Sequence, residues 1–405
     1  MKYQGRKIAI LGRGIEGVDA EKFLKSKGAI VTILDQNEDL GYLSKLDGFD
    51  SIVRSPGVYP YKSELKHLKN ITTPTAIFFE NCPAKIIGVT GTKGKGTTST
   101  LIYEILKKAK KDVYLAGNIG KPVLEILPKL KKESYVILEM SSFQLIDLGV
   151  SPHISVVLNI SLDHMDWHKD EKEYIDAKKN IVKFQNSTDW AVVNDEYETS
   201  KSFAKETKAN VFLFSKEKLD KKFKKDLTLR GEHNLENIAA AVTVAKILDI
   251  DEEVTIETVK NFKGLEHRLE FVKLIKGVGF YNDSFATGPQ PTIAAIKSFT
   301  EDETLILGGS DKGLDYKELG KCIEETRNVK NIILIGQIRN QIREFIKTKK
   351  IFDLEFSDMK IIVDKAFEIT PKGGVVILSP ASASFDMFKD YKDRGNQFKE
   401  AVKKL

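Results

Sequence analysis

The sequence predicts an α/β protein built mainly from parallel sheets and divided into three domains. Short β-branched runs alternate with amphipathic helical stretches along nearly the whole chain, which is typical of parallel strands joined by crossover helices. The 405 residues are also too many for one hydrophobic core. Turn-rich segments near Pro83 and Gly264 separate three blocks, so we predict domains at residues 1–82, 83–264 and 265–405. The predicted strands occupy residues 7–11, 30–34, 51–53, 85–89, 135–140, 154–160, 190–195, 210–215, 304–309, 331–336 and 375–380.

Composition excludes several classes of protein. Hydrophobic residues make up 41% and charged residues 30% of the chain, a balance typical of globular proteins. No apolar run approaches the roughly 20 residues of a membrane helix, and the run at residues 8–11 is too short for a signal-peptide core. We therefore expect a cytoplasmic protein without membrane contact.

The two cysteines and the modest positive charge limit which disulfides, metal sites and binding partners we expect. Cys82 and Cys322 are far apart in sequence, so we expect neither a structural disulfide nor a zinc site. The net charge of +6 comes from lysines interspersed with acidic residues, without a basic stripe that carries aromatics. We expect anionic small substrates, no nucleic acid, and a monomer.

The first block opens with a dinucleotide-type loop. Residues 12–17, GRGIEG, follow a predicted strand and fit G-x-G-x-x-G, and Asp35 ends the next strand. The glycines let the backbone approach a diphosphate, and the acidic residue lies near a ribose or base. Taken alone, this Rossmann-like pattern indicates a dinucleotide-dependent oxidoreductase.

A second and stronger phosphate-binding signal opens the central block. Residues 89–98, VTGTKGKGTT, follow a buried strand and precede a helix with one apolar face. The glycines let successive amides point at phosphates, the helix N-terminus adds its positive end, and Lys95 can reach the β- and γ-phosphates. Hydride transfer does not need a second nucleotide site, so this loop argues against an oxidoreductase. The predicted ATP-binding residues of the loop are Gly91, Thr92, Lys93, Gly94, Lys95, Gly96 and Thr97.

Polar residues follow later strands of the central block. Glu139 ends a buried strand, where ligands of parallel sheets bind, and a carboxylate beside phosphates indicates a divalent cation between them. His164 follows the next strand beside two carboxylates, for which a capping cluster is the alternative. Asn234 and Asn237 lie at i and i+3 of a helix start, which suits nucleotide contacts or simple capping.

Several segments together resemble the Mur ligase and folylpolyglutamate synthetase superfamily. GTKGKGT at residues 91–97 resembles its GTNGK[ST]T loop, with Lys93 in place of Asn and Gly96 in place of a magnesium-binding Ser or Thr. EMSSFQ at residues 139–144 resembles the LELSSFQL segment of the D-glutamate-adding branch. NISLDHMD at residues 159–166 resembles N-[IV]-x-x-D-H-[ML]-D.

The remaining resembling segments cover the rest of the chain in the expected order. They are SPGV at residues 55–58, GNIG at 117–120, YIDAK at 174–178, GEHNLEN at 231–237, LEHRLE at 265–270, NDSFATG at 282–288, GGSDKG at 308–313 and SPASASFDMF at 379–388, followed by Arg394-Gly395. In NDSFATG, Phe285 replaces a lysine and Gly288 replaces an asparagine. The SSFQ and SPASASFD segments are those that single out the D-glutamate-adding branch.

The resemblance implies an activity and a role for each domain. It implies ATP- and Mg²⁺-dependent ligation of D-glutamate to UDP-N-acetylmuramoyl-L-alanine through an acyl phosphate, in peptidoglycan precursor synthesis. The first domain then binds the UDP-substrate on a Rossmann-like frame, the central P-loop domain binds ATP, and a Rossmann-like third domain binds the amino acid. Because the Lys-Gly-hydroxyl order of the loop is closer to the folate enzymes, a folylpolyglutamate synthetase-like ligase is the main alternative. A catalytically inactive nucleotide-binding scaffold is a further one.

The resemblance also implies the site residues. The catalytic residues are Lys95, Glu139, His164 and a carbamylated Lys178, and Thr97, Glu139 and His164 hold the metal. ATP contacts outside the loop are Asn234, Asn237, Arg268 and Asp283. The UDP-substrate contacts are Gly14, Ile15, Glu16, Asp35, Gln36, Ser55, Gly57, Asn118 and Ser141. The D-glutamate contacts are Thr287, Lys312, Ser384, Phe385 and Tyr391.

Overall fold

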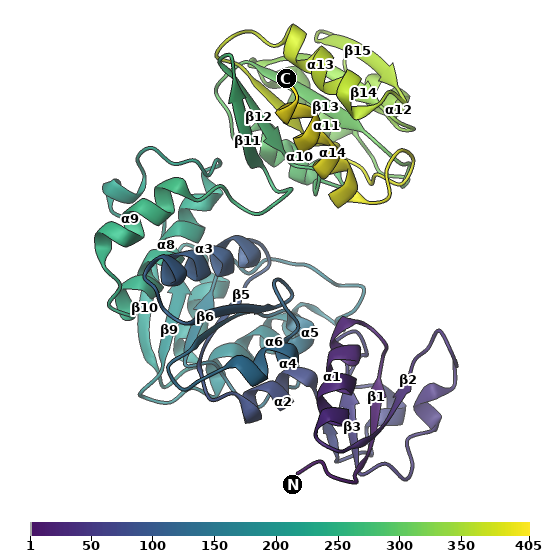
Figure 1. The fold of residues 1–405 in the computed structure, drawn as a ribbon, viewed down its shortest axis with the longest axis vertical. Coiled ribbons are helices and arrows are strands. Elements are labelled where there is room, and N and C mark those ends of the chain that lie inside the picture. Colours follow the sequence, from purple (N-terminus) through teal and green to yellow (C-terminus); the bar gives the residue numbers. More distant parts are fainter. Residues whose placement is uncertain (1) are drawn as a thin grey trace. The chain divides into compact units, whose positions relative to one another are not determined.

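The computed structural model describes residues 2–405, which divide into two compact units (Figure 1). One unit consists of Met1–Phe223 and Glu236–Val259, and the other of Lys224–Leu235 and Lys260–Leu405. In the part of the chain that is described, the strands form two sheets in the first unit and one in the second. The predicted α/β fold with mostly parallel sheets is confirmed. The three domain ranges stay predictions.

The first sheet has four parallel strands in the order β2-β1-β3-β4. Its elements are β1 (Lys7–Leu11), α1 (Ile15–Ser26), β2 (Ile30–Leu34), β3 (Ser51–Arg54), β4 (Ile71–Thr72) and α2 (Pro74–Asn81). Side chains of β1 alternate between two cores, because successive residues of a strand face opposite sides of the sheet. Ile8 and Ile10 pack with Leu24 of α1, whereas Ala9 and Leu11 pack on the other face.

The central sheet has six parallel strands in the order β10-β9-β8-β5-β7-β6. These strands are β5 (Lys85–Thr90), β6 (Val113–Gly117), β7 (Tyr135–Glu139), β8 (Ile154–Val157), β9 (Trp190–Asn194) and β10 (Asn210–Phe214). Its helices are α3 (Lys95–Lys108), α4 (Val123–Ile126), α5 (Ser142–Leu145), α6 (Glu171–Lys183), α7 (Glu198–Lys201), α8 (His233–Ile247) and α9 (Glu252–Asn261). The strand order reverses at β5, so the segments after β5, β7 and β8 begin side by side, at the position where open α/β sheets bind ligands.

The third sheet lies in the second unit, with strand order β11-β12-β16-β13-β14-β15. These strands are β11 (Glu270–Ile275), β12 (Val278–Asn282), β13 (Glu303–Gly308), β14 (Val329–Ile335), β15 (Lys350–Glu355) and β16 (Val375–Leu378). Only the β11–β12 pair of this sheet is antiparallel. The helices are α10 (Pro289–Ile296), α11 (Lys317–Glu325), α12 (Arg339–Arg343), α13 (Met359–Ile369) and α14 (Tyr391–Lys403).

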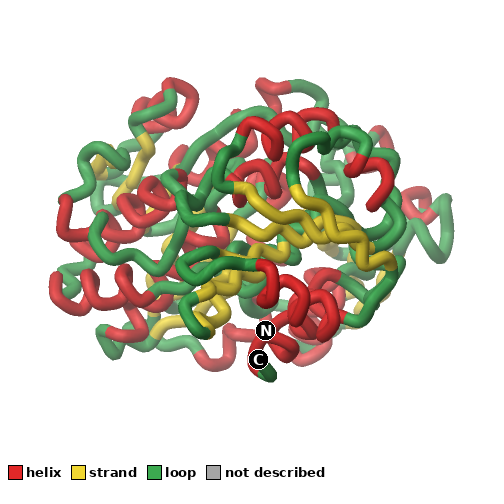
Figure 2. Tube along the Cα trace, turned by 90° about the horizontal axis from the view of Figure 1, so that it is seen from above, coloured by secondary structure: helices red, strands yellow, loops and turns green. Residues whose placement is uncertain are grey.

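Helices cover both faces of this third sheet. Leu305 of β13 packs with Leu319 of α11, whereas the neighbouring Ile306 packs with Ile362 of α13 and Phe398 of α14. Figure 2, in which strands are yellow and helices red, shows strands lying between layers of helices. Across residues 2–405, no helix is both long and apolar enough to cross a bilayer.

Candidate active site

The phosphate loop has the backbone shape that its glycines predict. Gly94 has φ +85° and directly precedes α3, so the loop turns into the helix in a conformation that L side chains avoid. A Cβ on Gly94 would lie 2.2 Å from the Asn237 side-chain oxygen, and one on Gly91 would lie 2.8 Å from Leu158. Only glycine fits at Gly94. Because the loop ends at a helix N-terminus, it suits an anionic phosphate chain.

Two lysines converge on the start of this loop. Lys95 Nζ donates to the carbonyl oxygens of Gly91 at 2.9 Å and Thr92 at 3.0 Å. Lys178 Nζ, on α6, donates to the same Gly91 oxygen at 3.0 Å. Burial, and secondarily the Lys95 charge, hold the pKa of Lys178 well below its usual value. The buried amine is therefore neutral over part of the range in which an exposed lysine is charged.

Thr92 ties the phosphate loop to the segment after β8 and to α6. Its hydroxyl donates to the Ser161 carbonyl oxygen at 2.7 Å and lies 2.8 Å from the Tyr174 hydroxyl. Its backbone N–H donates to the Asn159 oxygen at 2.7 Å. The predicted loop contact Thr92 thus serves the internal geometry of the site, and its hydroxyl is already engaged.

The hydroxyls at the start of α3 have different environments. Thr97 is partly exposed, whereas Thr98 is fully buried and donates to the Asn237 side-chain oxygen at 3.2 Å. Gly96 is buried and Lys93 is exposed. An oxygen ligand for a metal at the phosphates is therefore better supplied by Thr97 than by Thr98.

Glu139 and His164 lie in the segments that flank the phosphate loop. Glu139 is the last residue of β7, is half-buried, and acts on Lys178 by its charge. His164 is exposed, has φ +55°, and packs against the Phe143 ring with centroids 4.9 Å apart. In residues 2–405, no three His, Cys, Asp or Glu side chains are grouped to hold a metal on their own. The Thr97 hydroxyl and Glu139 carboxylate nevertheless offer the hard oxygen donors that Mg²⁺ prefers.

His168 is a buried residue near the site that the sequence did not single out. Its Nε2 lies 2.9 Å from the Ser142 hydroxyl of α5, and its Nδ1 lies 3.3 Å from the Glu173 carboxylate of α6. Burial lowers the pKa of His168. Glu173 also accepts a 2.7 Å hydrogen bond from the Tyr59 hydroxyl. This network connects the segment after β3 to the central sheet.

The first loop of the chain is closed by the residues that its motif predicts. A Cβ on Gly17 would lie only 2.0 Å from the Gly12 oxygen, so the third glycine of the motif allows helix and loop to meet. The Asp35 carboxylate accepts from the Asn37 N–H at 2.9 Å and the Arg13 N–H at 2.7 Å, and these bonds lower its pKa. Asp35 therefore braces the loop that was expected to receive the UDP-substrate.

Glu16 connects this loop to the segment after β7. Its carboxylate accepts from Gln144 Nε2 at 2.6 Å, while its other oxygen is buried without a hydrogen-bond partner in the structure. Burial raises the pKa of Glu16 to about 7. Ser141 and Gln144 form a reciprocal capping box at the start of α5. Both predicted contacts, Glu16 and Ser141, therefore belong to one local network.

Other predicted UDP-substrate contacts occupy loops near this network. Ser55 is buried and donates to the Gly12 oxygen at 3.2 Å. Asn118 is exposed, and its backbone N–H donates to the backbone carbonyl oxygen of Glu139 at 3.2 Å. The remaining predicted contacts are exposed: Gly14, Gln36 and Gly57 lie in the loops after β1, β2 and β3, and Ile15 is the first residue of α1.

Arg54 is a second residue that sequence reasoning missed. It is fully buried at the end of β3 and forms a 2.7 Å ion pair with Asp147 after α5. Its guanidinium also donates to the Ser55 and Val58 carbonyl oxygens at 3.1 and 2.5 Å. Arg54 thereby fixes the SPGV loop against the central sheet.

In the second unit, Asp283 follows β12 and is buried. It accepts from the Ser379 hydroxyl at 2.7 Å and the Leu269 N–H at 3.0 Å, and burial raises its pKa to about 7. Arg268 is exposed, and its guanidinium carbon lies 3.9 Å from the centroid of the Phe285 ring. Two predicted nucleotide contacts, Arg268 and Asp283, are therefore brought close together, because Leu269, the residue after Arg268, bonds to Asp283.

Arg394 of α14, named in a resembling segment but given no role there, is fully buried between the two segments predicted to bind D-glutamate. It donates to the hydroxyl and the carbonyl oxygen of Ser284, each at 2.9 Å, and to the Ser382 and Ala383 carbonyl oxygens at 3.0 and 3.3 Å. Burial lowers the pKa of Arg394 to about 10. The guanidinium holds the NDSFATG and SPASASFD segments together.

Of the predicted amino-acid contacts, Tyr391 joins this clamp, because its carbonyl oxygen accepts from the Ser284 hydroxyl at 2.8 Å. Ser384 is buried, Thr287 and Tyr391 are half-buried, and Lys312 is exposed. The Phe385 ring is 73% exposed, so it points out of the core.

The two predicted nucleotide contacts near the start of α8 have different partners. Asn234 donates to the Arg230 carbonyl oxygen at 2.6 Å, whereas Asn237 packs on the phosphate loop.

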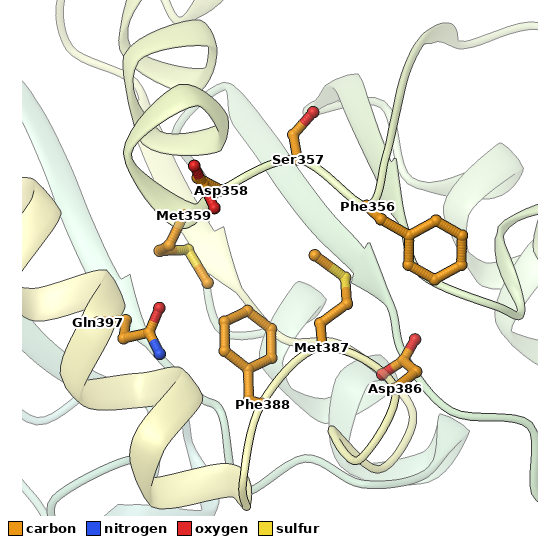
Figure 3. A pocket seen from close by; sticks show the side chains of 8 residues that line it. All are labelled: Phe356, Ser357, Asp358, Met359, Asp386, Met387, Phe388 and Gln397. Atoms are coloured by element: carbon orange, nitrogen blue, oxygen red, sulfur yellow. The ribbon is translucent and has the colours of Figure 1, made fainter.

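A pocket of about 200 Å³ lies in the second unit beyond the carboxyl ends of β15 and β16. Figure 3 shows Met359, Met387 and Phe388 turned toward one another around it. Asp386, on its rim, accepts from the Ser310 hydroxyl at 3.2 Å and the Gln337 N–H at 3.0 Å. These contacts hold the loop that carries Lys312, but none of the predicted site residues lines the pocket.

Comparison with known proteins agrees with this geometry. The Mur ligase middle domain model matches residues 89–228. A UDP-N-acetylmuramoylalanine–D-glutamate ligase of Acetivibrio thermocellus is 38% identical over 100% of this chain and 97% of its own length. One of Clostridium tetani is 38% identical over 99% of this chain and 97% of its own. The crystal structure of the MurF ligase of Thermotoga maritima in complex with ADP aligns with a TM-score of 0.59 at 19% identity, covering 99% of this chain and 96% of that one.

The parallel central sheet and its glycine loop define a P-loop nucleotide-binding protein of the Mur ligase type. The chain belongs to the family of UDP-N-acetylmuramoylalanine–D-glutamate ligases.

Proposed function

We propose that this protein ligates D-glutamate to UDP-N-acetylmuramoyl-L-alanine at the expense of ATP, in the cytoplasm and as a monomer. The observation that carries the proposal is the convergence of Lys95 and Lys178 on Gly91 at the carboxyl edge of the central sheet. Relatives that match 99–100% of this chain and bear this activity in their names support the choice of substrates.

The reaction proceeds in two balanced steps. A carboxylate oxygen of the alanyl group attacks the γ-phosphorus of ATP, so that an acyl phosphate forms and ADP leaves. The amine of D-glutamate then attacks the acyl carbon, an amide forms, and inorganic phosphate leaves with the loss of one amine proton. Loop amides and Lys95 stabilise the charge that develops on the transferred phosphoryl group, since positioning and electrostatics dominate such reactions.

Magnesium fits the oxygen donors of the central site. Thr97 and Glu139 would hold it, with His164 beside them, and the bound cation would supply charge neutralisation between the phosphates. Because Gly96 offers no hydroxyl after the loop lysine, Thr97 would supply the oxygen ligand, either directly or through a water. Asn237 supports the same loop from α8 through its contact with Thr98.

Carbamylation of Lys178 agrees with its environment. Only a neutral amine attacks CO₂, and burial keeps this amine neutral below the usual pKa of lysine. The carbamate would place a negative charge beside Lys95, which removes the repulsion between two cations at Gly91. Its charge would then orient the metal region rather than take part in bond making.

The second unit would bind the amino acid. Lys312, Thr287 and Ser384 form a set of one cation and two hydroxyls that suits a substrate with two carboxylates, with Phe385 and Tyr391 beside them. Arg268 and Asp283 would contact the nucleotide. The loops of the first sheet, braced by Asp35 and Ser55, would bind the UDP-substrate.

One assay tests the proposal. ADP release is measured with UDP-N-acetylmuramoyl-L-alanine and a panel of D-glutamate, L-glutamate, L-alanine and L-lysine. We expect turnover that depends on D-glutamate. Equal or faster turnover of L-glutamate on a folate substrate would replace the proposal by the folate alternative.

A further inference from the structure

Arg268 lies over the ring of Phe285, a residue that replaces a lysine of the resembling family segment. Its guanidinium carbon is 3.9 Å from the Phe285 ring centroid, well inside the roughly 6 Å over which a cation and a ring attract. Arg268 is exposed and Phe285 is 38% exposed, so the stacked pair faces solvent rather than the core. An arginine side chain that is free in water has many rotamers, and contact with the ring restricts it to a few of them.

The backbone holds the two partners at a fixed separation. The Phe285 N–H donates to the His267 carbonyl oxygen at 3.0 Å, directly before Arg268 in the chain. The Leu269 N–H, directly after it, donates to Asp283 at 3.0 Å. His267 and Leu269 both have positive φ, at 64° and 46°, so Arg268 projects from a sharply turned segment. The backbone hydrogen bonds of this turn therefore hold Arg268 and Phe285 in contact.

A second aromatic residue fixes the ring itself. Tyr391 meets Phe285 edge to face, with centroids 4.9 Å apart and planes at 86°, and Tyr391 also meets the His267 ring at 5.9 Å. Phe285 thus lies between Tyr391, a predicted D-glutamate contact, and Arg268, a predicted nucleotide contact.

We propose that Phe285 is a positioning residue that orients the Arg268 guanidinium for the ATP phosphates, in place of a direct cationic contact from its own position. This inference rests on the proposed function. The ring limits the directions in which the exposed Arg268 guanidinium can point. The ring would thereby compensate for the lysine that Phe285 replaces, because one well-oriented guanidinium would bind the phosphates in place of two cations.

The proposal is tested with variants at Phe285 and a matched control. Phe285→Leu keeps bulk and removes the aromatic face, whereas Phe285→Tyr keeps the face. Phe356 serves as the control, because it is 54% exposed and lies under the Arg339 guanidinium at 5.3 Å, away from the turn. ADP release gives kcat and the KM values for ATP and D-glutamate, and calorimetry gives the affinity for ADP.

We expect Phe285→Leu to raise the KM for ATP about 2- to 5-fold, in line with an exposed cation–π contact, and to leave kcat within about twofold. Phe285→Tyr should restore the wild-type KM, and Phe356→Leu should leave all constants unchanged. In an Arg268→Lys background, Phe285→Leu should add little, because the planar guanidinium that the ring orients is gone.

The outcomes separate this inference from the proposed function. If the wild-type protein ligates D-glutamate and Arg268→Lys is impaired, but Phe285→Leu binds ATP normally, the positioning role is wrong and the function stands. If Phe285→Leu and Arg268→Lys impair ATP binding additively, the ring acts independently of Arg268 and the inference is also wrong. If the wild-type protein does not ligate D-glutamate at all, the proposed function itself fails.

Discussion

Lys178 Nζ and the Gly91 carbonyl oxygen lie 3.0 Å apart, which joins the buried face of α6 to the first residue of the phosphate loop. Lys95 donates to the same oxygen. Two amines, Lys95 of the loop and Lys178 of α6, therefore lie within reach of one acceptor of the loop, and the electrostatics of the loop depend on the charge state of the buried Lys178.

The first prediction concerns how pH affects the protonation and carbamylation of Lys178. The pKa of Lys178 is lowered by burial, so protonation competes with carbamylation only below the lowered value. Activity at a fixed CO₂ concentration should rise as pH rises through that pKa and should fall when CO₂ and bicarbonate are removed. A ¹³C carbamate signal after ¹³CO₂ addition, absent in Lys178→Arg, provides the direct measurement. Full activity in CO₂-free buffer together with no ¹³C signal would exclude the carbamate.

Removal of the loop lysine should abolish catalysis without loss of fold. Lys95→Ala should lower kcat by about 100-fold or more, the usual cost of deleting one group that stabilises transition-state charge. Lys93→Ala, at an exposed position of the same loop, is the matched control and should have a much smaller effect. Circular dichroism should be unchanged in both. A Lys95→Ala enzyme that turns over normally contradicts the phosphate-loop assignment.

The two neighbouring threonines should separate metal binding from stability. Thr97→Val should clearly raise the magnesium concentration needed for half-maximal activity, because it removes a partly exposed oxygen. Thr98→Val should instead lower the Tm, since the hydroxyl that it removes is buried and bonded to Asn237, a loss of about 1–3 kcal/mol. A magnesium titration and thermal unfolding of both variants check this. Unchanged magnesium dependence in Thr97→Val would mean that water supplies the ligand.

Glu16 should make the protein less stable as pH rises. Its folded pKa of about 7 lies above the ordinary value of 4.5, so the folded state favours the protonated carboxyl. That contribution is complete below about pH 4.5 and is lost as pH rises through 7. Glu16→Gln, which mimics the protonated form, should therefore stabilise the protein at pH 8, by about 1 kcal/mol or more, and have little effect at pH 5. Urea unfolding at both pH values measures the difference; an equal effect at pH 5 and pH 8 would refute it.

Arg394 should be required for both stability and amino-acid binding. Arg394→Met leaves acceptors of Ser284, Ser382 and Ala383 buried without their donor, at a cost of about 3 kcal/mol or more. Arg394→Lys should restore part of the stability but not the forked geometry, so it should raise the KM for D-glutamate more than that for ATP. Equal changes in both KM values would point to general loosening of the unit.

Buried parallel strands were predictable, whereas several others were not. β5 was found because its residues after Lys85 are buried and β-branched or small. β6 and β15 were missed because they are half-exposed edge strands, whose apolar pattern is weak. β12 is buried but reads VGFYN, in which glycine and asparagine dilute the strand signal.

The site shows a similar division. The loop 91–97 and Glu139 carry their chemistry in contiguous residues, so their positions at the sheet edge followed from the sequence. Arg54 and Arg394 act on partners 93 and 110 residues away, and no local pattern encodes such a contact. His168 lies beside the predicted His164, but its burial against Ser142 depends on how α5 and α6 pack.

The ion pair between the buried Arg54 and the more exposed Asp147 has a consequence for protein engineering. The arginine comes from the first sheet and the aspartate from the central one, and the two sheets share a continuous apolar core. Replacing residues 1–82 with those of another ligase would therefore leave one charge unpaired unless the residue that pairs with it were transferred as well. Such an unpaired charge lowers the free energy of unfolding by about 3–5 kcal/mol. Modular exchange along this chain is feasible only when the graft carries both ends of the pair.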